Sequence, residues 1–170
     1  NWMGQIAYTW SQSYGNYEGY VKSDIGQGDA GLTQDFDFPG LMDNAYGFLP
    51  NDRRHNLKIF GAYAWDFGLQ LGGNIYYNSG RPRNAIAVHP TDPWAQLYDN
   101  SSFFYADGTP APRGTVGLTD DRYGLDVMLK YDFQAAGIAW NVRLDIFNTF
   151  DQSSVTYYSE TASTASGSPD

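Results

Sequence analysis

The sequence predicts an all-β fold, namely an antiparallel transmembrane β-barrel segment that supplies about five strands of a larger barrel. Two observations predict it. Five segments alternate apolar and polar residues with a period of two, and the connections between them alternate between very short and very long. Successive side chains of a strand point to opposite faces, so each segment has one apolar and one polar face. In a membrane barrel the apolar face meets lipid and the polar face lines the lumen.

The five expected strands are each about ten residues long or slightly longer, which is the length that a tilted strand needs to cross the hydrocarbon. The alternation is clearest in the fourth strand, where Leu125, Val127 and Leu129 share the apolar parity. Asp126 and Lys130 share the polar parity of the same segment. The expected strands cover residues 2–14, 55–65, 69–79, 122–133 and 138–150.

The lengths of the connections predict the orientation. Residues 66–68 and 134–137 form short turns, whereas residues 15–54 and 80–121 are long and rich in Gly, Pro, Asp and Asn. Bacterial barrels have short periplasmic turns and long extracellular loops. We therefore expect the first strand to run outward, and residues 15–54, 80–121 and 151–170 to form extracellular loops.

Aromatic residues of the apolar parity fall near both ends of the expected strands. Trp and Tyr gather at the two interfaces of a membrane, so this placement predicts two aromatic girdles. The girdle residues are Trp2, Trp10, Trp65, Tyr77, Tyr123, Tyr131, Phe133 and Trp140. The alternative is a soluble β-sandwich with paired aromatics, which is disfavoured because a sandwich rarely alternates short and long connections so regularly.

Composition excludes other classes of protein. No stretch approaches eighteen consecutive apolar residues, which excludes a helical membrane protein. The net charge of −9 argues against a nucleic-acid partner. Five strands cannot close a barrel, because the smallest outer-membrane barrels have about eight strands and an open edge in lipid leaves backbone groups unsatisfied. The chain is therefore expected to be a piece of a larger barrel or one contribution to an oligomeric barrel. The first is favoured, with outer-membrane lipid and the remainder of its own barrel as partners.

Several short motifs lie at the junctions between strands and loops. Tyr-Thr-Trp-Ser at 8–11 leads into Ser-Tyr-Gly-Asn at 13–16, and Leu-Pro-Asn-Asp-Arg-Arg-His occupies 49–55. Ser-Gly-Arg-Pro at 79–82 and Leu-Asp-Ile-Phe-Asn-Thr-Phe at 144–150 close two of the strands. In this order the set resembles the C-terminal barrel region of TonB-dependent outer-membrane receptors. The Oar-like branch is the nearest match, since the Asp-Phe-Asp of residues 35–37 and the run at 49–55 lie in the same loop.

The resemblance implies energised uptake of a scarce nutrient through a barrel of about twenty-two strands in the cell outer membrane of a Gram-negative bacterium. It also implies an N-terminal plug domain and a contact with the TonB complex, both outside this chain. The ligand is an unknown small molecule, and no cofactor is expected. A structural or adhesive outer-membrane protein, or a passive porin, remains the alternative.

No set of residues suggests an enzyme. The chain has no cysteine, and neither His55 nor His89 has a spaced partner that would form a nucleophile–base pair. His55 follows Asp52, Arg53 and Arg54, which we expect to fix the return of the chain into the second strand by hydrogen bonds.

The loop over residues 15–54 is acidic. Its carboxylates suggest contact with a cationic ligand or with calcium, which takes carboxylate and carbonyl oxygens. The spacing in residues 24–29 does not match an EF-hand, so a solvated loop supported by glycines is favoured. The ligand candidates in this loop are Asp24, Asp29, Asp35 and Asp37.

The loop over residues 80–121 carries a group of aromatic residues that could stack on sugars or apolar ligands, or pack the loop onto its neighbours. They are Trp94, Tyr98, Phe103, Phe104 and Tyr105.

On the polar parity of the strands, a set of charged residues is expected to face the lumen. Pairing across neighbouring strands would satisfy these charges, and docking of the plug is a second role. The set comprises Lys58, Asp126, Lys130, Asp132, Arg143 and Asp145.

Overall fold

The computed structural model describes residues 1–162, which form two compact units. The sheet unit consists of Asn1–Trp10, Arg54–Ser79 and Asp121–Ser154, and the loop unit of Ser11–Arg53, Gly80–Asp120 and the chain from Val155 onward. Residues 163–170, the end of the third expected loop, lie outside the described residues.

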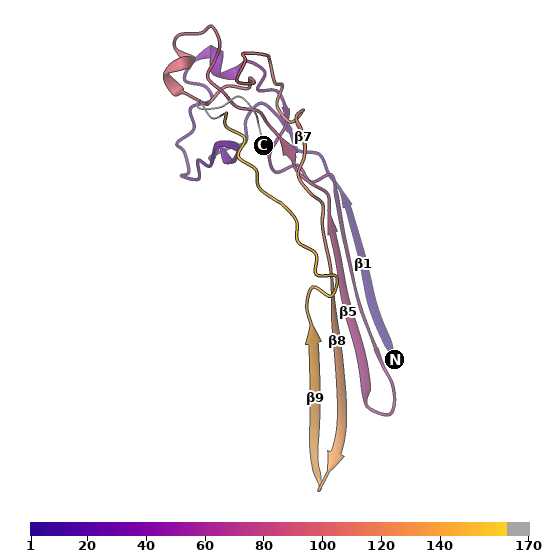
Figure 1. The fold of residues 1–170 in the computed structure, drawn as a ribbon. Coiled ribbons are helices and arrows are strands. Elements are labelled where there is room, and N and C mark those ends of the chain that lie inside the picture. Colours follow the sequence, from indigo (N-terminus) through magenta and orange to yellow (C-terminus); the bar gives the residue numbers. More distant parts are fainter. Residues whose placement is uncertain (163–170) are drawn as a thin grey trace. The chain divides into compact units, whose positions relative to one another are not determined.

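The sheet unit is a single antiparallel meander. Its strands pair in the order β1, β4, β5, β8 and β9, so each strand neighbours the next long strand along the chain (Figure 1). This confirms the predicted all-β class and the antiparallel arrangement of the five strands. The strands span Trp2–Trp10 (β1), His55–Ala64 (β4), Leu69–Asn78 (β5), Arg122–Ala135 (β8) and Ile138–Ile146 (β9).

Two strands end earlier than the alternation suggests, and the causes are local. β1 stops at Trp10, because the backbone of Ser13 is held instead by the carboxylate of Asp52, whose Oδ1 accepts its N–H at 2.7 Å. β9 stops at Ile146 because Asn148 and Asp151 both adopt positive φ angles, which turn the chain away from an extended path. β8, by contrast, continues two residues past the expected end, to Ala135.

The two short connections are tight turns, as their lengths predict. β8 and β9 are joined by Ala136 and Gly137 alone, with φ angles of 54° and 77°. Positive φ at both central residues is the geometry of a type I′ turn, whose twist matches that of the flanking strands. In the β4–β5 turn the N–H of Gly68 donates to the carbonyl of Trp65 at 3.1 Å, and Gly68 adopts φ 97°.

The registers align the apolar positions of all five strands. Ile6 lies opposite Ile59, which in turn lies opposite Ile75. Because every strand keeps the same parity, one face of the sheet is apolar and the other is mixed and polar. One complete apolar row consists of Trp2, Tyr63, Leu71, Leu129 and Leu144, and one row of the other face of Gln5, Phe60, Asn74 and Asp126.

The loop unit is folded around its own core. It contains two short ladders, β2 (Tyr14–Gly15) with β3 (Gly47–Phe48) and β6 (Pro82–Arg83) with β7 (Gly117–Leu118). It also contains three short 3-10 helices, η1 (Ser23–Ile25), η2 (Pro39–Met42) and η3 (Ala95–Tyr98). No helix among residues 1–162 has the length and apolar character required to cross a membrane.

All three expected loops contribute to this unit. Ala45 comes from the first loop, while Ile86 and Phe103 come from the second, and the three side chains form one buried cluster. Thr161 of the third loop bridges Ile86 in parallel orientation. Residues 15–54 are therefore not solvated throughout, because part of this loop is buried against residues far along the chain.

Candidate functional site

The loop unit encloses a group of charged side chains. Lys22 is only 1% exposed, and its Nζ lies 2.6 Å from Oδ1 of Asp35. The same Nζ donates to the carbonyl of Ser101 at 3.1 Å, which links the first loop to the second. A buried ammonium is stable only when paired and hydrogen-bonded, so these contacts hold the two loops in one arrangement.

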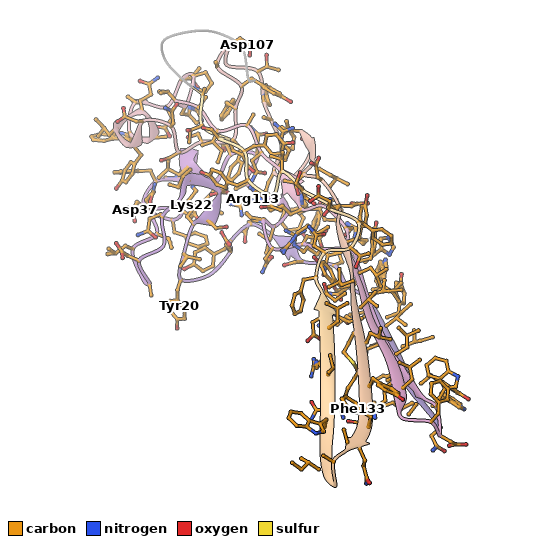
Figure 2. All side chains as sticks on the ribbon, turned by 60° about the horizontal axis from the view of Figure 1, so that its bottom comes forward. Tyr20, Lys22, Asp37, Asp107, Arg113 and Phe133 are labelled. Atoms are coloured by element: carbon orange, nitrogen blue, oxygen red, sulfur yellow. The ribbon has the colours of Figure 1, made fainter. Side chains whose placement is uncertain are left out.

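Arg113 lies beside this pair and is equally buried. Its guanidinium carbon is 4.4 Å from the centroid of the Phe103 ring, and its Nη2 is 3.9 Å from Oδ2 of Asp24. Burial raises the pKa of Asp24 to about 6, against the opposing effects of Arg113 and Lys22. We call Lys22, Asp24, Asp35, Phe103 and Arg113 the buried charge cluster; Figure 2 shows Lys22 and Arg113 inside the loop unit.

The structure places four of the sequence-predicted site residues in the interior of the loop unit. Asp24, Asp35, Phe103 and Phe104 are buried in the loop unit, where the two carboxylates face cations of the protein and the two rings pack in its interior. Four candidate ligand contacts are thus interior residues in this structure. Among residues 1–162, no three His, Asp or Glu side chains are grouped so that they could hold a metal ion.

The other candidates lie at the surface, and several of them meet. The indole of Trp94 stacks on Phe38 at 5.8 Å between ring centroids and remains 61% exposed. Tyr98 packs edge-on against Phe38, and its hydroxyl donates to Oδ2 of Asp37 at 2.7 Å. This hydrogen bond raises the pKa of Tyr98. We call Asp37, Phe38, Trp94 and Tyr98 the aromatic platform. Asp29 is exposed and Tyr105 half-buried, outside these contacts.

His89 has a structural role that its sequence context does not reveal. Its Nδ1 accepts the backbone N–H groups of Thr91 and Asp92, at 3.2 and 2.8 Å. Nδ1 therefore carries no proton, and Nε2, which does, donates to Oδ2 of Asp43 at 3.2 Å. Asp92 in turn accepts the N–H of Trp94 at 2.8 Å. The imidazole thus fixes the backbone that presents the aromatic platform.

A second contact missed from the sequence is made by Glu160. Its side chain is buried, with Oε1 2.7 Å from Nη1 of Arg81 and Oε2 accepting the backbone N–H of Asn84 at 3.0 Å. The guanidinium of Arg83 lies 4.0 Å over the ring of Tyr158. Together these contacts attach the third loop to the second. The surrounding Ser- and Thr-rich composition gave no signal of it.

The residues before the second strand anchor the chain much as expected. Asp52 is buried and accepts the N–H of Ser13, as described above, and the carbonyl of Arg53 accepts the Ser11 hydroxyl at 3.3 Å. Within the sheet unit, the hydroxyl of Tyr8 lies 2.8 Å from Nδ1 of His55, and the His55 N–H donates to Oγ of Ser79 at 3.1 Å. The hydrogen-bonding role predicted at this junction is confirmed for Asp52.

Charges on the polar face of the sheet pair along strands. Nζ of Lys130 lies 2.9 Å from Asp132 two residues on, and Arg143 binds Asp145 with Nε–Oδ2 at 2.8 Å. The predicted pairing across strands is wrong here, because the register places Lys130 directly opposite Arg143. Each cation instead pairs with the carboxylate two residues further along its own strand, on the same face of the sheet. Asp126 does meet a cross-strand partner, the amide of Asn74 at 3.4 Å, and Lys58 lies opposite Ala7 and Tyr76.

The aromatic residues assigned to girdles occupy the two ends of the apolar face. Trp2 is paired with Tyr63, and Phe133 with Trp140, at the end where the tight turns lie; Trp65 and Tyr131 are also at this end. Tyr77 is paired with Tyr123 at the end where the long loops depart, where Trp10 closes β1. The rows between them are mainly aliphatic.

A two-faced antiparallel meander with short turns at one end and long connections at the other is the pattern of outer-membrane β-barrel proteins. The chain is 32% identical over 164 residues to the TonB-dependent transporter Oar of Myxococcus xanthus. This match covers 94% of the chain and confirms the resemblance to Oar-like TonB-dependent receptors over nearly its whole length. The chain spans 14% of the length of that relative. No family model and no solved structure matches it.

Proposed function

We propose that this chain is part of a TonB-dependent outer-membrane transporter that takes up a scarce nutrient. The in-register apolar face carries the proposal, because it would be an energetic liability in water. Trp2 is 80% exposed and Ile6 72% exposed on a sheet with no second layer over this face in the sheet unit. Lipid removes that liability, and the aromatic ends fit the two membrane interfaces.

The edges of the sheet support membership of a larger barrel. Within the described residues, β1 pairs only with β4, and β9 only with β8. Each unpaired backbone group would cost several kcal/mol in hydrocarbon, so further strands are needed on both sides, and we propose that the same protein supplies them. The resemblance to the transporter family favours a closed barrel of about twenty-two strands.

The polar face suits a wet or plug-filled lumen. Its ion pairs, Lys130 with Asp132 and Arg143 with Asp145, are self-contained on each strand and require no partner beyond the sheet. At these two pairs a plug domain would therefore meet charges that are already satisfied. This makes plug docking compatible with the lumen surface without making it necessary for the stability of the strands.

In this proposal the loop unit lies outside the cell and receives the ligand. The first two connections that enter it leave the sheet at the end marked by Trp10, His55, Asn78 and Arg122. Binding residues tend to lie on loops held by a rigid scaffold. The exposed aromatic platform is the part of the loop unit best suited to that role.

The test is a comparison of growth on limiting medium in four strains: wild type, a deletion of the gene for the complete protein, a strain with the TonB complex inactivated, and the double mutant. The proposal expects the deletion to slow growth only while the TonB complex is active. A passive porin would still contribute in the absence of TonB, so an additive defect in the double mutant would overturn energised transport. An adhesive protein would give no growth defect in either background.

A further inference from the structure

Most basic residues of the loop unit contact acidic or aromatic side chains of the same unit. The unit holds thirteen of the nineteen acidic residues of the chain and five of its ten basic residues, so −8 of the net charge of −9 belongs to it. Four of the five basic side chains contact acidic or aromatic side chains of the same unit: Lys22, Arg81, Arg83 and Arg113. The charge presented to solvent is therefore strongly negative.

The aromatic platform lies within this negative surface. One face of the Trp94 indole stacks on the ring of Phe38. The backbone N–H of Trp94 donates to the carboxylate of Asp92. The carboxylate of Asp37 is fixed by the hydroxyl of Tyr98, and Figure 2 shows Asp37 at the outer edge of the unit. Two carboxylates and a largely exposed indole are thus held in place before any ligand arrives.

We propose that the aromatic platform binds a basic peptide, with an arginine or lysine side chain of the peptide against the exposed face of Trp94. Indole is the best aromatic partner for an organic cation, and it attracts one through the negative face of its ring. The carboxylate of Asp37 would bind the same cation, and the negative field of the loop unit would speed its approach. This inference rests on the proposed extracellular position of the loop unit and names the ligand class for that function.

A neutral sugar is the competing ligand for an aromatic surface. It would use the indole face but would gain nothing from a unit of charge −8, and its binding would not change with salt. A basic peptide would bind more weakly as salt rises. The two ligand classes are therefore distinguishable on the same protein.

The experiment is titration calorimetry on the complete protein in detergent, with acetyl-Arg-Arg-Arg-amide, acetyl-Glu-Glu-Glu-amide and maltotriose as probes. Only the arginine peptide should bind, with affinity falling as salt rises. Trp94→Ala should weaken it by about threefold to thirtyfold, and Trp94→Phe should retain most of the binding. Asp37→Asn keeps an acceptor for Tyr98 and should weaken binding through the lost charge alone.

Two matched controls lie in the same unit. Tyr46→Ala removes an aromatic ring of similar exposure, 65%, and Asp107→Asn removes an exposed charge; both should leave the affinity unchanged. Preferred binding of maltotriose, failure of the arginine peptide to bind, or equal binding by wild type and Trp94→Ala would each overturn the inference. Equilibrium binding needs no energy source, so its result is independent of whether uptake requires TonB.

Discussion

Asp24 and Arg113 face each other in the interior of the loop unit at 3.9 Å, a separation too long for a hydrogen bond between them. Neither oxygen of Asp24 has a hydrogen-bond partner, and no nitrogen of the guanidinium has one. The pair attracts without the geometry that would compensate both groups for leaving water. Its ionised form is therefore costly, which agrees with the raised pKa of Asp24.

The first prediction concerns pH. The pKa of Asp24 in the folded unit, about 6, is higher than its ordinary value of 3.8, so the folded state binds the proton more tightly than the unfolded chain. Its contribution to stability therefore rises as pH falls from 7 through 6 toward 4, by up to about 3 kcal/mol. Lys22, Arg113, Glu18 and Asp35 are the charges acting on it.

Resistance of the loop unit to protease in the complete protein provides the measurement, because cleavage follows the population of the open form when reclosing is fast. Wild type should gain more protection between pH 7 and pH 5 than Asp24→Asn, which cannot titrate at this position. Parallel pH profiles for the two proteins would show that Asp24 is not the group responsible.

The second prediction concerns the Lys22–Asp35 pair. Lys22→Met alone leaves the Asp35 carboxylate buried without its cation and should destabilise the loop unit by about 3–5 kcal/mol. The double variant Lys22→Met/Asp35→Leu removes both charges and should recover most of that loss, since apolar replacements of a buried pair are often tolerated. Urea dependence of protease protection would measure both, with Asp29→Asn as the exposed control. A double variant as unstable as the single one would contradict this account.

The sheet could be predicted from sequence because its determinants are local. Parity along residues 122–133 fixes which side chains share a face, and Ala136 with Gly137 permits only a tight turn. The contacts of the loop unit are not local: Lys22 meets Ser101, and Asp43 meets His89. An acidic, Gly-rich composition is typical of solvated loops, and it gave no indication that some carboxylates have buried cationic partners.

The third prediction tests the attachment of the third loop. Glu160→Ala removes the carboxylate that pairs with Arg81 and leaves the buried N–H of Asn84 without its acceptor. We expect a loss of about 2–4 kcal/mol in the local stability of that attachment, seen as faster amide hydrogen exchange at Ile86, whose N–H binds the carbonyl of residue 160. Ser159→Ala, at the exposed neighbouring position, should exchange like wild type. Equal exchange at Ile86 in all three proteins would show that Glu160 does not stabilise the attachment of the third loop.

The last prediction tests the assignment of the two faces. Val127 lies mid-strand in β8 on the apolar face, opposite Gly73 and Ile146, whereas Met128 lies on the polar face opposite Gly72 and Asp145. An arginine near the bilayer midplane on the lipid face costs about 2–4 kcal/mol, so Val127→Arg should reduce the unfolding free energy of the complete barrel by that amount. Met128→Arg places the same cation beside the carboxylate of Asp145 in a wet lumen and should cost much less.

Denaturant titration of both variants refolded in lipid vesicles compares them directly, and Val127→Leu controls for the change of size. Equal losses for the two arginine variants would mean that the apolar face does not meet lipid, and the membrane-barrel interpretation of the sheet would have to be abandoned.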